Sequence, residues 1–358
     1  DPLWSRGLGD VYKRQIIEND NLLAYYKFNA GSGNIIYDYS GNQNHGTING
    51  ATWLENIEGC TDELACNYNP DSNIDDDTCD YSCHDNGDYS LDFDGVDDWV
   101  EINDSQSLDN PEAITFSAWI NTDQLNDEIG ILTKGNGING GGIAIRLRQG
   151  KAAFSATSTS SGEYWDLFET PHIIDGNWHH IVGTFDTEYI KCYVDGELVQ
   201  MRSTGEPYYS SSENMKIASG GNGEGTFDGK ITKAAIWHSS LSGQQVQSLY
   251  NNQLVDTSTM QADWRFQSGS GELLYDYSGN QNHGTINGAG WQENILGCMD
   301  ELACNHNPDA NISDHSCDYS CHDNGDYSLS FDGVDDYVDL GADSVSYTHL
   351  TLPTNREV

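Results

Sequence analysis

Residues 89–102 read Tyr-Ser-Leu-Asp-Phe-Asp-Gly-Val-Asp-Asp-Trp-Val-Glu-Ile, and this stretch decides the fold. The apolar residues Leu91 and Phe93 alternate with aspartates, which is the period of a strand with one buried face. Gly95 then turns the chain, and Trp99 begins a second strand. A strand, a tight turn and another strand in direct succession indicate antiparallel β-structure.

The same two-residue alternation continues along the chain. Further strands are expected at Leu22–Phe28, Ala113–Ile120, Gly130–Lys134, Gly142–Arg148, Lys151–Ala156, Trp178–Phe185, Tyr189–Asp195, Glu197–Met201, Asn214–Ala218 and Phe227–Trp237. About a dozen short strands separated by turn signals predict an all-β fold, a two-sheet antiparallel jelly-roll sandwich. One helix is expected at Ser242–Asn251, because Ser242 is an N-cap residue and Gln245 follows three positions later.

A long stretch of the sequence occurs twice. Leu22–Ile102 returns as Met260–Leu340, so that Cys60 and its counterpart Cys298 lie 238 positions apart. Each copy holds a lead-in, a cysteine module and the strand pair quoted above. A repeat of this length indicates whole domains, since solenoid repeats are much shorter.

The repeat suggests the following domain organisation. Residues 21–256 are expected to form one jelly roll with a cysteine-rich insert at 59–83, and residues 259–344 the truncated start of a second, with an insert at 297–321. A fragment with only the first strands could not close a sandwich, so its strand edges should be exposed. Residues 1–15 and 345–358 resemble translated sequencing-adapter sequence, and we expect them to be non-native and disordered.

The composition limits the classes of partner. The chain has 57 acidic and 15 basic residues and a formal net charge of −42. Such a surface repels nucleic-acid phosphates and anionic lipid and favours cations. With 36% hydrophobic residues the chain can build a core, and no apolar run approaches the ~20 residues of a membrane span.

Each cysteine module carries four cysteines in the spacing C-x5-C-x12-C-x3-C. They are Cys60, Cys66, Cys79 and Cys83 in the first copy, and Cys298, Cys304, Cys317 and Cys321 in the second. A short acidic segment without a hydrophobic run needs a covalent or metal staple. Two disulfides per module are expected, which implies an oxidising compartment, and a zinc site is the alternative. The pairing stays open, because four cysteines allow three connectivities. Cys192 is expected to be a buried free thiol.

Oxygen-bearing side chains follow one another at alternate positions inside the module. Asp71, Asn73, Asp75 and Asp77 have the spacing of a short calcium loop, although not that of an EF-hand. The second copy keeps Asp309, Asn311 and Asp314 but has Ser313 and His315 at two positions, so its site should be weaker. The alternative is an acidic, solvated turn.

Several motifs in order resemble a known family. They are LLAYYKFNAGSG, YDYSGNQNHGTINGA, YSLDFDGVDDWVEI, ITFSAWI, GNWHHIVGTFD, YIKCYVDGEL and FDGKITKAAIWHSSLSGQQVQSLYNN. Together they resemble the laminin-G-like, concanavalin A-like jelly roll of many secreted bacterial proteins, which is related to pentraxins. The cysteine module is similar to GCTD…ACNYNP segments of secreted proteins from marine Bacteroidetes. The resemblance implies a calcium ion near the loops of the sandwich, with Asp94, Asp97, Asp98, Asn222, Glu224 and Asp228 as candidate ligands.

A sugar site would need aromatic faces beside polar side chains. Tyr164, Trp165, Tyr208 and Tyr209 are the candidate ligand-binding residues. An exposed tryptophan forgoes about 4 to 6 kcal/mol of burial, so Trp165 is expected to be at least half packed. His179 and His180 alternate along a strand, face opposite sides and are expected to be structural.

The sequence does not predict an enzyme. Glucanases on this fold carry Glu-x-Asp-x-x-Glu or Glu-x-Asp-x-Glu on one strand, and neither pattern occurs here. We therefore expect an extracellular or cell-surface, non-catalytic adhesion module that binds carbohydrate or protein with the help of calcium. The alternatives are a structural spacer repeat of a large surface protein and an accessory domain of a polysaccharide-degrading enzyme.

Overall fold

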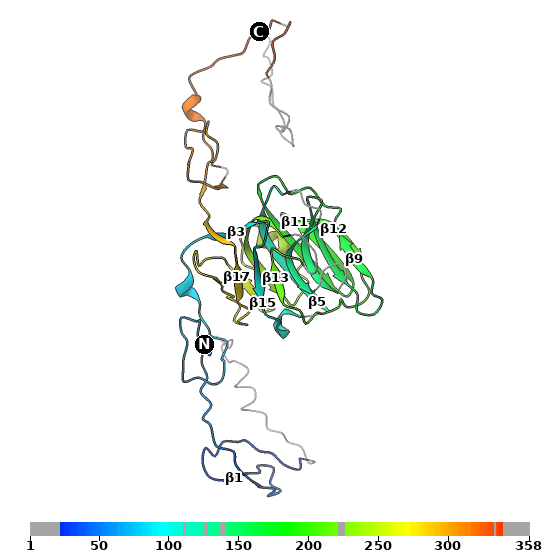
Figure 1. Ribbon diagram of the computed structural model, residues 1–358, viewed down its shortest axis with the longest axis vertical. Helices are drawn as coiled ribbons and strands as arrows, with labels where there is room; N and C mark the ends of the chain where they lie inside the picture. The colour runs from blue at the N-terminus through cyan, green and yellow to red at the C-terminus, as the bar shows by residue number, and fades with distance from the viewer. Residues whose placement is uncertain are drawn as a thin grey trace. The chain divides into compact units, whose positions relative to one another are not determined.

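The computed structural model describes residues 22–109, 112–124, 128–135, 141–220, 226–314, 316–332 and 334–338. Two eight-stranded antiparallel sheets pack face to face (Figure 1), which confirms the predicted all-β sandwich. Residues 1–15 and 345–358 lie outside the described residues.

The strands divide between the sheets as follows. The first sheet has the order β12 (Glu197–Ser203), β11 (Tyr189–Val194), β10 (Trp178–Asp186), β5 (Ala113–Asn121), β14 (Asp228–Trp237), β3 (Tyr89–Asp94) and β18 (Gly290–Glu293), with β15 (Met260–Trp264) also paired to β14. The second sheet has the order β16 (Leu273–Leu274), β17 (Gly284–Asn287), β4 (Trp99–Ile102), β13 (Met215–Ile217), β6 (Glu128–Gly135), β7 (Gly142–Arg148), β8 (Lys151–Thr157) and β9 (Tyr164–Leu167).

One hydrophobic core fills the space between the sheets. Leu91 and Phe93 are buried there, as their alternation with exposed aspartates predicts. Gly183 on β10 faces the ring of Phe154 on β8, and a Cβ atom at this glycine would lie 2.1 Å from that ring. A side chain at position 183 would therefore push the two sheets apart at the centre of the core.

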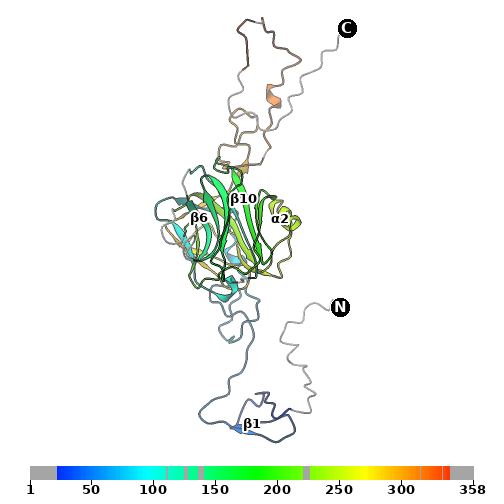
Figure 2. The ribbon, with the colours of Figure 1, turned by 90° about the vertical axis from the view of Figure 1, so that its right-hand side faces the viewer.

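The predicted helix is present as α2 (Gly243–Tyr250). Ser242 accepts a hydrogen bond from the backbone of Gln245, and the Gln245 side chain accepts one from the backbone of Ser242, which completes a capping box. Val246 is fully buried, in a small cluster with residues of β10 and β14. Figure 2 shows α2 on the outside of the sheet that contains β10.

The second copy of the repeat contributes strands to this same sandwich. We call residues 22–55 the first lead-in and residues 260–293 the second lead-in. Within the second lead-in, β15 pairs with β14 and β18 with β3 in one sheet, while β17 pairs with β4 in the other. The second lead-in thus crosses from one sheet to the other and closes both.

The expected boundary at residues 256–259 is therefore wrong. Compact packing divides the chain after Asn294, and the second unit begins at Ile295. The physical reason is burial: Trp264, Phe266 and Leu274 are each at most 1% exposed in the core that the second lead-in shares with β3, β4 and β14. The second lead-in is the closing part of one sandwich and not an open fragment of another.

The first lead-in is not part of these sheets. Its strands β1 (Ile35–Ile36) and β2 (Gly46–Thr47) form a separate two-stranded sheet in the described part of the chain. Its apolar side chains are largely exposed, with Phe28 at 64%. The expectation that this segment belongs to the sandwich of residues 89–256 is therefore also corrected.

The cysteine modules contain the predicted disulfides. The pairs are Cys60–Cys79 and Cys66–Cys83 in the first module, and Cys298–Cys317 and Cys304–Cys321 in the second. Each closes a loop of under 20 residues and contributes on the order of 2 to 4 kcal/mol. The remaining thiol, Cys192, is free and buried as expected, and burial raises its pKa to about 12.

The first module packs on the second lead-in. Tyr81 is 1% exposed and lies against the rings of Tyr275, Tyr277 and His283. His283 Nε2 is 2.8 Å from a carboxylate oxygen of Asp62. The second module, in the second unit, has the same fold around β19 (Leu296–Gly297) and β20 (Ile312–Ser313).

The two lead-ins offer a matched test of closure. Phe266→Ala should lower the free energy of unfolding by about 3 to 5 kcal/mol, because it empties a buried site. Phe28→Ala, at the equivalent position, should change it by less than about 0.5 kcal/mol because that ring is exposed. Both phenylalanines have a positive φ, so backbone strain cancels in the comparison. Urea unfolding followed by tryptophan fluorescence gives both values, and equal losses would contradict the assignment.

Candidate functional site

A groove lies on the outer surface of the sheet formed by β10, β5, β14 and β15. Its volume is about 500 Å³, which is within the ~300 to 1,000 Å³ common for ligand sites. The residues that line it include Asp88, Ser117, Trp119, His180, Lys233, Trp237, Leu249, Met260, Asp263, Arg265 and Gln267. The groove therefore combines residues from the centre of the sheet, the end of α2 and the second lead-in.

The floor of the groove is aromatic and buried. His180 and Trp237 are 1% and 2% exposed. The ring of Trp119 stacks on that of His180 at 4.9 Å and on that of Tyr250 at 5.6 Å. Trp119, His180 and Trp237 point outward because they alternate along β5, β10 and β14 with side chains of the core.

Three polar atoms at the groove have no hydrogen-bond partner in the protein. They are Nδ1 of His180, Nε1 of Trp237 and Oε1 of Gln267, and each is buried. Nε2 of His180 is 2.8 Å from the hydroxyl of Ser117, so only one ring nitrogen is satisfied internally. Leaving a buried polar group unpaired costs about 1 to 3 kcal/mol, which a polar ligand or ordered water would recover.

Charged side chains at the rim are already paired with each other. Arg265 donates to Asp263 at 2.7 Å, and Lys233 lies 3.8 Å from Asp88. Lys233 sits in a bulge of β14 with φ of 49°, and such bulges re-aim a side chain. Burial raises the pKa of Asp263, against the opposing effect of Arg265. The groove thus offers balanced charge at its edge and unpaired neutral polar groups at its floor.

Three of the predicted metal ligands come together elsewhere. Carboxylate oxygens of Asp94, Asp97 and Asp98 lie within 4.8 Å of one another at the turn between β3 and β4. Asp98 is 6% exposed and accepts a hydrogen bond from the backbone of Asp94. Burial and the charges of Asp94 and Asp97 raise the pKa of Asp98. Asp228, on the neighbouring strand β14, is paired directly with Asp94 of β3. Asn222 and Glu224 lie outside the described residues.

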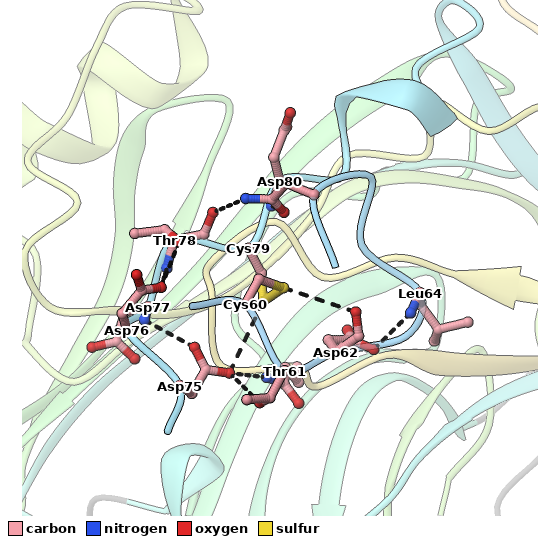
Figure 3. Close-up of a disulfide and its surroundings, with 12 residues drawn as sticks. Cys60, Thr61, Asp62, Leu64, Asp75, Asp76, Asp77, Thr78, Cys79 and Asp80 are labelled. Atoms are coloured by element: carbon pink, nitrogen blue, oxygen red, sulfur yellow. Dashed lines mark hydrogen bonds between the residues drawn. A yellow bond between two sulfur atoms is a disulfide. The ribbon is translucent and has the colours of Figure 1, made fainter. Parts of the chain in front are cut away.

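The acidic loop of the first module is arranged differently. Asn73 accepts from the backbone of Ile57 and donates to that of Glu55. Asp75 accepts from Thr61, the backbone of Asp77 and Gln281, and Figure 3 shows it turned toward the Cys60–Cys79 disulfide.

In the predicted calcium loop, Asn73 and Asp75 therefore use their side-chain oxygens in hydrogen bonds within the protein. Among the described residues, Asp71, Asp75 and Asp77 are not among the groups of three or more His, Cys, Asp or Glu side chains with clustered ligand atoms. The same applies to the second module, where Asn311 accepts from the backbone of Ile295, Asp314 accepts from that of Ser316, and Asp309 is exposed.

The four aromatic residues that were predicted to bind a ligand do not form an exposed site together. Trp165 and Tyr208 are 0% exposed and pack against Phe185 in the core. Tyr164 is half-buried over Arg146, and only Tyr209 is exposed, at 47%. The interpretation of Trp165 and Tyr208 as ligand residues is therefore corrected. Their neighbours in sequence are polar, but the register of β8 with β9 turns Trp165 inward.

Sequence reasoning missed the groove for a clear reason. Its walls include Met260, Asp263, Arg265 and Gln267, which the repeat assigned to another domain. The available signal was the alternation of Ser117 and Trp119 with core residues on β5, which places a tryptophan on the outer face. His180 was expected to be structural; its Nε2 contacts Ser117, but it also lines the groove and its Nδ1 has no partner there.

Comparison with known proteins identifies the fold class. Residues 94–247 match the family model Laminin_G_3, described as the concanavalin A-like lectin/glucanases superfamily. The sandwich is thus a concanavalin A-like domain. The match spans less than half of the chain and agrees with the laminin-G-like resemblance of its motifs.

Several solved structures are similar to parts of this chain at low sequence identity. One is a protein from Bacteroides ovatus to which carbohydrate binding has been ascribed, with 18% identity, a TM-score of 0.47 and a match over 58% of this chain and 60% of that one. Domain 4 of the arabinanase AbnA from Geobacillus stearothermophilus, solved with arabinotriose, has 18% identity, a TM-score of 0.36 and coverages of 42% and 71%. Mouse laminin α1 domains LG4-5 have 12% identity, a TM-score of 0.35 and coverages of 43% and 43%.

No curated protein matches this sequence. Among the described residues, every helix is too short or too polar to span a bilayer.

The buried His180 predicts a pH dependence of stability. Burial lowers its pKa from 6.5 to about 4. The unfolded chain therefore binds a proton between these values while the folded chain does not, and stability falls as pH drops from 6.5 to 4. In urea unfolding at pH 4.5 and 7.5, His180→Gln should remove about 2 kcal/mol of this difference.

His179 supplies a control of opposite sign. Although burial acts to lower the pKa of His179, hydrogen bonds and charges of Asp195 and Asp175 raise it overall. Its stabilising contribution is present below 6.5 and is lost as pH rises through the raised pKa. A His179→Gln variant should therefore lose most stability at low pH, and identical pH profiles for the two variants would refute both assignments.

Proposed function

We propose that the sandwich is a non-catalytic binding module of an extracellular or cell-surface protein, and that its groove binds a neutral sugar unit of a glycan. The observation that carries this proposal is that His180, Trp237 and Gln267, each with a buried polar atom that has no partner in the protein, together line one aromatic groove. A sugar presents hydroxyl groups that donate and accept, together with apolar C–H faces that pack on aromatic rings.

Charge supports a neutral ligand. The net charge of −42 repels anionic groups. The cationic side chains at the rim, Lys233 and Arg265, are paired with Asp88 and Asp263. An anionic ligand would have to break these pairs, whereas a neutral one can use the floor of the groove and leave them in place.

Two observations support the non-catalytic and extracellular parts of the proposal. The paired-carboxylate strand patterns of glucanases on this fold do not occur in the sequence. Four disulfides in two short modules are typical of proteins from oxidising compartments. A protein surface is the alternative ligand.

Glycan-array screening followed by calorimetry tests the groove. Trp237→Phe and Gln267→Leu each remove one unpaired polar atom and keep most of the apolar volume. Each should weaken binding of a neutral glycan by roughly 5- to 10-fold, since one hydrogen bond contributes about 1 kcal/mol.

Tyr209→Ala is the matched control. Tyr209 is an exposed aromatic residue that does not line the groove, so its removal should leave affinity unchanged. A folded protein that binds no neutral glycan would sink the sugar proposal. Binding that survives both groove variants but fails in Tyr209→Ala would move the site to that loop.

We also propose that calcium binds at Asp94, Asp97 and Asp98. Carboxylate oxygens are the ligands calcium prefers, and three of them are gathered here around the nearly buried Asp98. A bound divalent cation would offset the repulsion that raises the pKa of Asp98. In that state the turn between β3 and β4 would be held rigid beside Asp228.

Thermal melting with calcium or with a chelator tests this site. Calcium at 100 times its dissociation constant should add about 2.7 kcal/mol and raise the melting midpoint by roughly 5 to 10 °C. Asp98→Asn should abolish that rise. It should also raise the metal-free midpoint, because it removes a buried charge among like charges.

Asp336→Asn is the control for calcium. Asp336 occupies the same repeat position in the second copy and is exposed, so the melting of the sandwich should not respond to it. A midpoint that chelator leaves unmoved in the unmodified protein would remove calcium from the proposal without affecting the groove.

A further inference from the structure

The two lead-ins have the same local fold. Asp276 accepts hydrogen bonds from the backbone of Asp263, Ser278 and Asn282. Asp38 accepts from the equivalent Tyr25, Ser40 and Asn44. In both, a histidine contacts the backbone of the central aspartate and a tryptophan donates to a glycine carbonyl. The first lead-in is therefore already shaped like the segment that closes the sandwich.

Their burial is opposite. Phe266 and Trp264 are 1% and 0% exposed, whereas the equivalent Phe28 and Tyr26 are 64% and 36% exposed. In the second lead-in these rings contact the core of the sandwich. The first lead-in presents the same apolar pattern on the same backbone without that cover, and exposed patches of this kind mark interaction surfaces.

The cysteine modules differ in burial in the opposite sense: the first module is covered and the second is exposed. Tyr81 of the first module is 1% exposed because the second lead-in covers it, while the equivalent Tyr319 of the second module is 49% exposed. Leu329 and Phe331 are also exposed, at 73% and 53%, although their counterparts Leu91 and Phe93 are buried. The repeating unit is thus a module, then a sandwich, then a closing lead-in.

We infer that the first lead-in is the closing segment of another laminin G-like sandwich, one built like residues 89–257. The sandwich of this chain is not its partner, because the second lead-in already pairs with β3, β4 and β14. The partner sandwich offers the same open edges to Phe28, Ile36 and Gly46–Thr47. This inference rests on the fold and is independent of any ligand of the groove.

The arrangement has a consequence for a series of such repeats. Each sandwich is completed by the lead-in that also starts the next cysteine module, so adjacent repeats share a structural segment. A sandwich cannot then be separated from the following repeat without exposing its core. This property suits a chain that holds binding modules in fixed sequence.

A tandem protein tests the inference directly. An additional copy of residues 84–259 is joined to Leu22 in place of residues 1–21, and residues 22–358 follow unchanged. Hydrogen exchange is measured by mass spectrometry. Peptides within residues 44–54 that include Thr52 or Leu54 are unique to the first lead-in, and their exchange should slow by about 100-fold relative to the chain without the addition. Peptides shared by both copies of β10 should show a single, protected population.

The control carries Phe28→Asp and Ile36→Asp in the tandem protein. Its added sandwich should stay open, so that shared β10 peptides split into a protected and a fast-exchanging population. The inference is overturned if the unmodified tandem protein also shows two populations. It is equally overturned if residues 44–54 exchange no more slowly with the addition, or exchange slowly in the chain without it.

Discussion

The sandwich depends on one constraint: the open edges of β3, β4 and β14 must be paired by a segment that crosses between the sheets. The second lead-in meets it, because β15 and β18 join one sheet and β16 and β17 the other. Unpaired edges at these strands would leave backbone donors and acceptors exposed beside a hydrophobic core. The folded sandwich, and any site on it, therefore depends on closure by the second lead-in.

The groove is a product of the same closure. Its floor belongs to β5, β10 and β14, but Asp263, Arg265 and Gln267 come from the second lead-in and form one wall. A ligand that bridges floor and wall binds only the closed sandwich and so stabilises closure by mass action. The charge pair of Arg265 with Asp263 lies within that wall, which links the electrostatics of the rim to the fold.

Much of the fold could be predicted from local patterns. Leu91 and Phe93 predict a buried strand face, and Ser242 with Gln245 predicts the start of the helix. The cysteine spacing predicts the disulfides. Each of these features depends on contacts within a few residues or on covalent chemistry. The site could not be predicted in this way. Polar neighbours suggest that Trp165 is a surface residue, but strand register decides which way a side chain points, and register is set by the partner strand.

The domain boundary could not be predicted from the repeat for a related physical reason. A period of 238 residues, as between Cys60 and Cys298, fixes the length of the repeating unit but not where the unit begins, because any starting point gives the same period. Only the burial of particular side chains shows where along the chain the repeating unit begins. Phe28 and Phe266 are the same residue at the same repeat position, and one is exposed while the other is in the core. Sequence similarity between copies therefore carries no information on which copy completes which sandwich, whereas the pairing of β17 with β4 does.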